Sequence, residues 1–320
     1  NKCYFFCADD THGTPVMLKA NELGIKPEEL IADVLEDHKS TYDLYSINFN
    51  NNYTTRSDEN KKFSEQIYES AKNNNLISKS SVEQYFDKKE GMFLSDRFIK
   101  GTCPKCGAED QHGDNCGVCG ASYDILDLKN PISIISNSVP IRKKSDHIFF
   151  DLPQKKEMLK DFIKNVELQT SIKNKLNEWL NDDLKKWDIS RDAPYFGFKI
   201  PDEIDKYFYV WLDAPIGYLA SISNWADNNN LKMVDLWSEK SNYEIYHFIG
   251  KDIAYFHGLF WPALLSSGGY KLPNGSIHEY LGKQYRAGLR ERLQSHQCHY
   301  WLRRESEDLA TVFAACAANG

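Results

Sequence analysis

Four cysteines in two close pairs constrain the fold of this chain more than any other feature: Cys103, Cys106, Cys116 and Cys119. Their spacing is C-x2-C-x9-C-x2-C, and two thiolates that lie two residues apart can bind one metal ion from a single tight turn. The glycine after each pair, Gly107 and Gly120, permits the positive φ that points backbone N–H groups toward sulfur. Two such turns predict a closed, structural site for one Zn2+ per chain, with mononuclear iron as the alternative.

Composition excludes several classes of protein. The other four cysteines are scattered, and a secreted disulfide scaffold would be shorter and richer in cysteine than these 320 residues. The sequence contains neither a run of 18 apolar residues nor a charged leader followed by an apolar segment. The 46 acidic and 39 basic side chains give a net charge of −7. This charge excludes a protein that binds nucleic acid or an anionic membrane through its overall charge alone. We therefore expect a cytoplasmic protein with no DNA and no membrane partner.

The pattern of residues 1–75 is typical of an α/β sheet. Residues 3–8 form an apolar run that predicts a strand buried on both faces, and a polar loop follows it. We predict one helix capped by Thr14, a second that begins near Pro27 and a third that begins near Ser57.

Residues 76–188 have a different pattern, which predicts an insertion within the α/β domain. Its short strand-like pieces surround the cysteines, and a helix with apolar residues from Ile172 to Trp187 follows. The α/β pattern then returns in residues 189–280. The predicted strands of both parts are 84–86, 92–94, 97–99, 132–136, 147–151, 207–212 and 244–249.

Polar residues follow three of the predicted α/β strands, at Asp9 to Gly13, at Asp213 to Pro215, and at Gly250 to Asp252. Ligands bind beyond the carboxyl ends of strands in open α/β sheets, so we expect these clusters to converge. The carboxylates can bind an ammonium group, and the nearby aromatic residues can bind the apolar side chain of a ligand. The Gly-Lys-Asp turn can bind a nucleotide. Together they predict an amino acid and ATP as ligands. Taken singly, each has a structural alternative, such as helix capping by Asp9 or a core position for His257.

The last forty residues differ in composition from the rest. Residues 1–280 contain 29 Lys and four Arg, whereas residues 281–320 contain one Lys and five Arg. The contrast predicts a different coding origin for 281–320, by frameshift, fusion or read-through. The alternative is a basic C-terminal helix.

Four long segments resemble the catalytic domain of methionyl-tRNA synthetases, over roughly residues 1–275. They are Cys-Ala-Asp-Asp-Thr-His-Gly-Thr-Pro (7–15), Asp-Ile-Ser-Arg-Asp-Ala-Pro-Tyr-Phe-Gly (188–197), Tyr-Val-Trp-Leu-Asp-Ala-Pro-Ile-Gly-Tyr (209–218) and Phe-Ile-Gly-Lys-Asp-Ile-Ala-Tyr-Phe-His (248–257). The resemblance is to the bacterial type, with one four-cysteine zinc knuckle in its connective insertion. It implies a class I Rossmann-like catalytic domain that the insertion divides.

The resemblance also implies an activity and a set of site residues. The activity is ligation of L-methionine to tRNA(Met) through methionyl-adenylate, with ATP and Mg2+. Asp10 would hold the ammonium group of methionine, and Arg191 would support the electrostatics of the active site. The methionine side chain would be bound by Trp211, Ala214, Pro215, Tyr218, Ile253 and His257. ATP would be bound by Gly250, Lys251 and Asp252.

Two signatures of the class are expected to be missing, which predicts that the chain is inactive. The His-Ile-Gly-His type motif would precede Asn1, together with the first strand at the centre of the sheet. The Lys-Met-Ser-Lys-Ser loop would follow His278-Glu279-Tyr280-Leu281, where the arginine-rich tail stands instead. Removal of one transition-state charge stabiliser costs about 10²–10³ in rate.

Three other functions remain as alternatives. One is a class I synthetase for leucine, isoleucine, valine or cysteine. Another is a zinc-ribbon nucleic-acid binder, which the net charge disfavours. The third is a catalytically inactive paralogue that serves as a partner subunit or methionine sensor.

Overall fold

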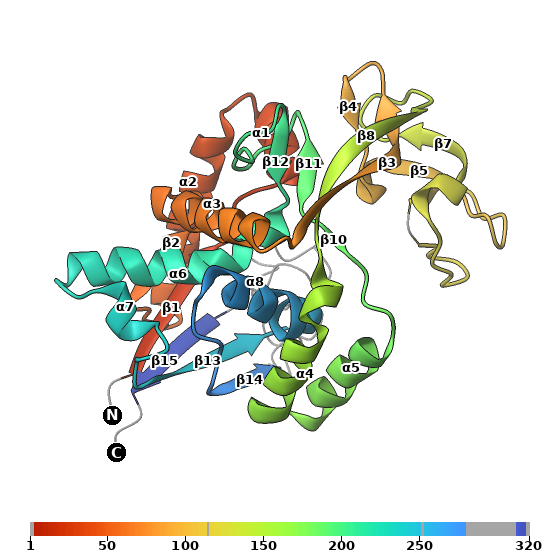
Figure 1. Cartoon of the computed structure of the whole chain (residues 1–320). Coiled ribbons are helices and arrows are strands. Elements are labelled where there is room, and N and C mark those ends of the chain that lie inside the picture. Colours follow the sequence, from red (N-terminus) through yellow and green to blue (C-terminus); the bar gives the residue numbers. More distant parts are fainter. Residues whose placement is uncertain (1–2, 114, 251–252, 280–311, 318–320) are drawn as a thin grey trace.

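In a computed structural model, the protein is described for residues 3–113, 115–250, 253–279 and 312–317. The α/β half has one six-stranded sheet with the order β2-β1-β15-β13-β14-β9 (Figure 1). Strand β1 pairs in parallel with β2, and β13 pairs in parallel with β14. The strands are β1 (Cys3–Asp9), β2 (Asn51–Thr54), β9 (Glu167–Leu168), β13 (Tyr243–Ile249), β14 (Ser276–Glu279) and β15 (Val312–Ala317).

The centre of this sheet contains a strand from the C-terminal end of the chain. Strand β15 lies between β1 and β13 and runs antiparallel to both. It therefore occupies the central position at which the first strand of the fold was expected. The rest of the tail, at 280–311 and 318–320, lies outside the described residues, as does the motif position at Tyr280-Leu281.

Eight helices are described, and most belong to the α/β half. They are α1 (Thr14–Leu23), α2 (Pro27–Leu44), α3 (Asp58–Asn73), α4 (Lys156–Asn165), α5 (Thr170–Asn181), α6 (Val210–Asn228), α7 (Met233–Leu236) and α8 (Trp261–Gly268), with a π-helical turn at Phe256–Phe260. Helix α6 packs on β1 and β2, and α3 packs on α6 and α8. Gly217 makes the first of these contacts possible, because a Cβ there would lie 2.9 Å from Thr55 Cγ2.

Several sequence predictions of local structure are wrong in detail. Residues 207–212 are not one strand: β12 (Lys206–Phe208) is followed at once by α6. Gly13, and not Thr14, is the N-cap of α1. Helix α5 ends at Asn181, so Trp187 lies beyond it in β10 (Trp187–Asp188). The apolar run at 207–212 was equally compatible with a buried strand or a buried helix, and the other two differences are helix boundaries.

The insertion begins with a long antiparallel ribbon formed by β3 (Ile77–Asp87) and β8 (Ile141–Phe150). The ribbon leads from the α/β half to a small lobe that carries the cysteines (Figure 1). The other strands here are β4 (Met92–Phe93), β5 (Ile99–Thr102), β6 (Gln111–His112), β7 (Lys129–Ser133) and β10. Strand β11 (Ser190–Asp192) follows β10 and pairs with β12. The predicted strand at 97–99 is mostly a 3-10 turn, Asp96–Phe98.

The α/β half and the lobe each have their own hydrophobic core, and the two cores differ greatly in size. The core of the α/β half is continuous and includes Phe6, Leu219, Leu259 and Trp261, all fully buried. The core of the lobe has only four buried members, namely Tyr85, Leu94, Ile99 and Leu128. The lobe therefore needs a further source of stability.

Candidate functional site

The four predicted metal ligands meet in the lobe. Their Sγ atoms all lie within 4.8 Å of one another. The Sγ atoms of Cys103 and Cys119 are 3.9 Å apart, and those of Cys106 and Cys116 are 3.6 Å apart. Tetrahedral Zn2+ with Zn–S bonds near 2.3 Å separates its sulfurs by about 3.8 Å. The donor set and its spacing therefore fit one tetrahedral metal ion.

The backbone around this cluster favours thiolates. Gly107 and Gly120 have φ values of 78° and 70°, as the sequence predicts for the two turns. Burial raises the pKa of Cys103, but the backbone N–H groups of Cys106 and Lys105 outweigh it and lower that pKa to about 6. The backbone N–H of Cys119 lowers the pKa of Cys116 in the same way. Lowered thiol pKa values favour metal binding near neutral pH.

The first polar cluster forms the loop between β1 and α1. The Thr11 backbone N–H donates to Thr55 Oγ1 (3.0 Å), and the Gly13 N–H donates to the Phe196 carbonyl (2.8 Å). Asp9 is buried, and its Oδ2 accepts a hydrogen bond from His38 Nδ1 (2.7 Å). The hydrogen bond to Asp9 raises the pKa of His38 and outweighs burial, which lowers it. Asp10, the predicted ammonium ligand, is exposed beside this ordered loop.

A buried pair that the sequence did not predict joins this loop to helix α6. His12 Nδ1 contacts Asp213 Oδ2, and both side chains are buried. Asn60 Nδ2 donates to the Asp213 backbone carbonyl (3.2 Å) and to the Thr55 carbonyl (2.8 Å). His12 and Asp213 each belong to a predicted polar cluster, but the sequence analysis assigned neither of them a role. The available signal was Asp213 itself, since an ionisable residue inside an apolar run needs a partner.

The first turns of α6 bring most of the predicted methionine-site residues together. Trp211 stacks on Phe256 with ring centroids 4.1 Å apart and an interplanar angle of 11°. Tyr195 Oη accepts from the Val210 N–H (3.0 Å), which satisfies a free donor at the helix start. Ala214 is half-buried and Pro215 is buried, one and two residues after Asp213.

The other predicted methionine-site residues, Ile253 and His257, come from the segment after β13 and join those of α6 in one aromatic cluster. The Tyr218 hydroxyl lies 2.9 Å from His257 Nε2, and His257 Nδ1 lies 3.1 Å from the Ile253 carbonyl. A carbonyl only accepts, so Nδ1 carries the hydrogen and Nε2 accepts from Tyr218. Burial lowers the pKa of His257 to about 4, which keeps the imidazole neutral. The neighbouring His247, with its ring 5.5 Å away, has a pKa that burial lowers well below its ordinary value.

The remaining predicted residues lie around this cluster. Among the described residues, no heavy atom lies within 4 Å of a Cβ placed at Gly250. Lys251 and Asp252 lie outside the described residues. The Arg191 guanidinium lies 3.7 Å from the ring centroid of Tyr209, the residue before α6. Arg191 Nη1 also lies 3.5 Å from Asp188 Oδ2.

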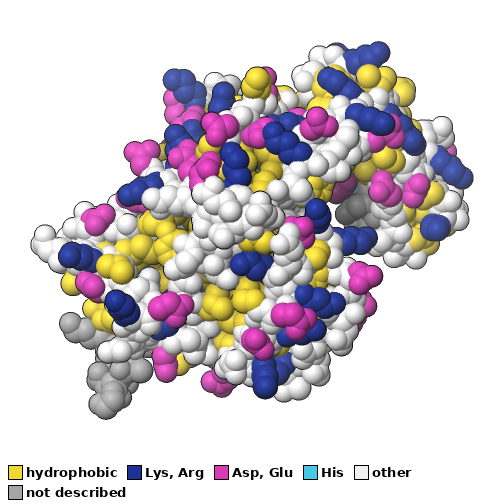
Figure 2. Space-filling view, in the orientation of Figure 1, with side chains coloured by type: hydrophobic (Ala, Val, Ile, Leu, Met, Phe, Trp, Pro, Cys, Tyr) yellow, Lys and Arg dark blue, Asp and Glu magenta, His cyan; other side chains and the backbone are white. Residues whose placement is uncertain are grey.

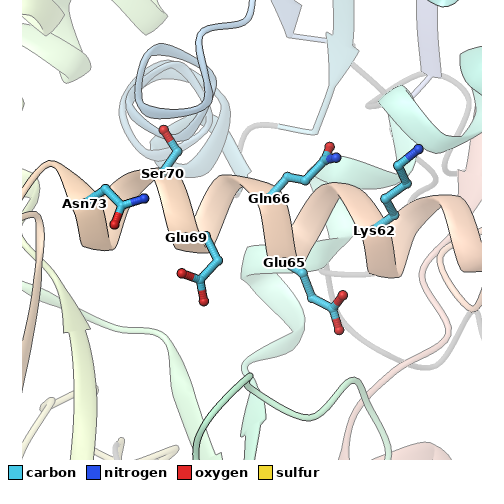
Figure 3. A pocket seen from close by; sticks show the side chains of 6 residues that line it. All are labelled: Lys62, Glu65, Gln66, Glu69, Ser70 and Asn73. Carbon is cyan, nitrogen blue, oxygen red and sulfur yellow. The ribbon is translucent and has the colours of Figure 1, made fainter.

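The surface adds little to this site. A shallow pocket on α3 contains none of the predicted site residues; it is lined by Lys62, Glu65, Gln66, Glu69, Ser70 and Asn73 (Figure 3). Charged side chains of both signs are interspersed on the visible face and form no single basic patch (Figure 2). Among the described residues, no helix has both the length and the apolar character needed to span a membrane.

Comparison with known proteins identifies the family and the fold. The family described as "tRNA synthetases class I (M)" matches residues 1–285. Two solved structures of Mycobacterium tuberculosis methionyl-tRNA synthetase with methionyl-adenylate have TM-scores of 0.60 and 0.61, each at 18% identity. Each comparison covers 85% of this chain and 48% of the other, so the chain spans about half the length of those proteins.

These matches confirm the family and the fold class that the sequence predicts. The fold is a mixed α/β class I synthetase domain with an insertion that carries the four-cysteine cluster. The chain therefore belongs to the class I tRNA synthetase family, within the group described as class I (M).

Proposed function

We propose that the chain is the methionine-activating part of a methionine–tRNA ligase. In this reaction the carboxylate of L-methionine attacks the α-phosphorus of ATP, which forms methionyl-adenylate and releases pyrophosphate. A ribose hydroxyl of tRNA(Met) then attacks the aminoacyl carbonyl and releases AMP. Neither step needs a covalent protein nucleophile, so catalysis rests on positioning and charge stabilisation.

The observation that carries this proposal is the neutral, aromatic cluster at the start of α6. The Tyr218 hydroxyl already donates to His257, so this pair offers no spare charged donor. The Trp211–Phe256 stack supplies flat apolar surface beside it. A thioether is apolar and polarisable and suits such surroundings. Ala214, Pro215 and Ile253 would complete the binding of the methionine side chain.

The polar parts of the ligands would bind around this cluster. Asp10 is exposed at the end of β1, where its carboxylate would pair with the methionine ammonium group. Gly250 would leave room for the adenosine. Lys251 and Asp252, which follow it in the sequence, would be further ATP ligands, and ATP would bind with Mg2+. Arg191 would add positive charge next to Tyr209.

The metal site has a structural role in this proposal. We assign one Zn2+ per chain to the four cysteines, whose thiolates would leave no open coordination position. Such a site needs reduced thiols, which a cytoplasmic location maintains.

Calorimetric titration with L-methionine tests the proposal, with L-leucine as the control ligand. The test variant is Tyr218→Phe, which leaves the buried His257 Nε2 without its donor; the matched control is Tyr123→Phe in the lobe. We expect selective methionine binding that Tyr218→Phe weakens about tenfold, since an unsatisfied buried acceptor costs about 1–3 kcal/mol. Equal affinity for both amino acids, or no binding, would contradict the proposal. Methionine binding without adenylate formation is the result expected if the two signature motifs are missing, and it would fit a methionine sensor equally well.

A further inference from the structure

A buried histidine of the ribbon lies between two carboxylates, one on β10 and one on β11. His147, on β8, is 2% exposed. Its Nδ1 lies 2.5 Å from Asp188 Oδ2, and its Nε2 lies 3.1 Å from Asp192 Oδ2. A carboxylate only accepts hydrogen bonds, so a ring that bonds to both must carry a hydrogen on each nitrogen. The imidazolium form therefore satisfies this geometry.

Further polar and charged side chains contact the histidine and its two carboxylates. Gln84 Nε2, from β3, lies 2.5 Å from His147 Nε2. Because an amide nitrogen only donates, the imidazolium form requires the Gln84 amide to present its oxygen to the ring. Asp192 Oδ1 also accepts from Lys206 Nζ (2.5 Å) and from Ser145 Oγ (2.8 Å). The facing charges are therefore those of Asp188, Asp192, Lys206 and Arg191.

The two carboxylates bracket the arginine of the candidate site. Arg191 lies between Asp188 and Asp192 in the sequence, contacts Asp188 and donates to the Ser190 carbonyl (2.6 Å). Its guanidinium covers the ring of Tyr209, and Tyr209 is the N-cap of α6. The contacts thus form a continuous path from β8 of the insertion to the helix that carries Trp211.

We propose that His147 is a positioning residue, which bridges Asp188 and Asp192 and thereby holds Arg191 over Tyr209 at the start of α6. The insertion then acts on the methionine site through this bridge. The identity of the ligand rests on the proposed function, but the bridge itself does not.

The titration of His147 gives the bridge a pH dependence. Burial lowers the pKa of His147, but the hydrogen bonds and charges of Asp188 and Asp192 outweigh it and raise that pKa above its ordinary value. The bridge is therefore complete below about pH 6.5, the ordinary value, and is lost as the pH rises through the raised value.

Hydrogen exchange followed by mass spectrometry tests the bridge without a ligand. The variants are His147→Ala and the neutral His147→Gln, with His112→Ala, an exposed histidine of the lobe, as the control. We expect exchange over residues 188–213 to rise about tenfold in His147→Ala, less in His147→Gln and not in His112→Ala, while α3 stays unchanged. In the parent protein the same segment should exchange faster above the pKa of His147, after correction for intrinsic rates, and His147→Gln should abolish this extra change.

A second readout separates this inference from the proposed function. Methionine affinity should fall about tenfold in His147→Ala and lose its dependence on pH in His147→Gln. If the parent chain binds no methionine, the proposed function fails and the exchange data alone decide on the bridge. Unchanged exchange over 188–213, or an equal rise in every segment including α3, would overturn the inference.

Discussion

The lobe and the α/β half are stabilised by different means. The α/β half has a continuous core of large buried side chains such as Phe6 and Trp261, whereas the core cluster of the lobe has four buried members among the described residues. The lobe compensates with four cysteines whose spacing fits a metal ion. We therefore expect the lobe to fold only with a bound metal ion, and the α/β half, which carries the candidate site, to fold without one.

Of the substitutions considered, loss of one metal-site cysteine should have the largest effect, and this effect should be confined to the lobe. In Cys103→Ser we expect the lobe to unfold, because structural zinc contributes about 10–16 kcal/mol in zinc-finger peptides. Zinc content by atomic emission and hydrogen exchange over residues 96–133 would measure the loss. The matched control is Cys3→Ser, at an exposed cysteine of β1, which should retain one metal ion per chain. Equal unfolding of α3 and α6 in Cys103→Ser would show that the two regions are not independent.

A cavity in the core of the α/β half should destabilise that half and leave the lobe folded. Leu219 on α6 is fully buried, so Leu219→Ala should lower the free energy of unfolding by about 2–5 kcal/mol. Urea unfolding followed by tryptophan fluorescence would measure it, with Leu44→Ala, at an 83% exposed position, as the control. The lobe should keep its metal throughout. Metal loss at the same urea concentration would contradict the comparison.

Acid should weaken the α/β half through its buried histidines. The folded-state pKa of His257 is lowered from 6.5 to about 4. The neutral form therefore stabilises the fold fully above about pH 6.5, and this contribution is lost as the pH falls toward 4. We expect a loss on the order of 1–3 kcal/mol, measured by urea unfolding at several pH values, and a shallower dependence in His257→Phe. A slope unchanged by the substitution would assign the acid sensitivity to other groups.

The smallest effect is expected at an exposed ion pair between the two regions. Lys79 Nζ, on β3, lies 2.7 Å from Glu203 Oε1, and the lysine side chain is 59% exposed. Lys79→Gln should change the free energy of unfolding by less than about 1 kcal/mol, because solvent screens such pairs. The same measurement on His147→Gln should show a larger loss, since that bridge is buried. A larger loss in Lys79→Gln would reverse this order.

The sequence predicted the features whose determinants are local. The cysteine spacing predicted the metal cluster, and the apolar runs predicted β1 and β13. The start of α6 was not predicted, because a short apolar run at 207–212 is compatible with either a strand or a helix.

Contacts between distant segments could not be predicted from the sequence. His12 and Asp213 are 201 positions apart, and His147 and Asp188 are 41 apart. Each side chain gains its partner only when the sheet and the ribbon have formed. No periodicity or spacing rule relates such residues, so the pairs appear only in the folded structure.

Binding of a stable sulfamoyl analogue of methionyl-adenylate would test the central claim most directly, since it engages the amino-acid and adenosine sites together. Calorimetry would compare it with the leucyl analogue, which differs only in the amino-acid side chain. We predict that the methionyl analogue binds at least about tenfold more tightly, consistent with about 1–3 kcal/mol of discrimination in an apolar site. Equal affinity for the two analogues, or no binding of either, would contradict the account.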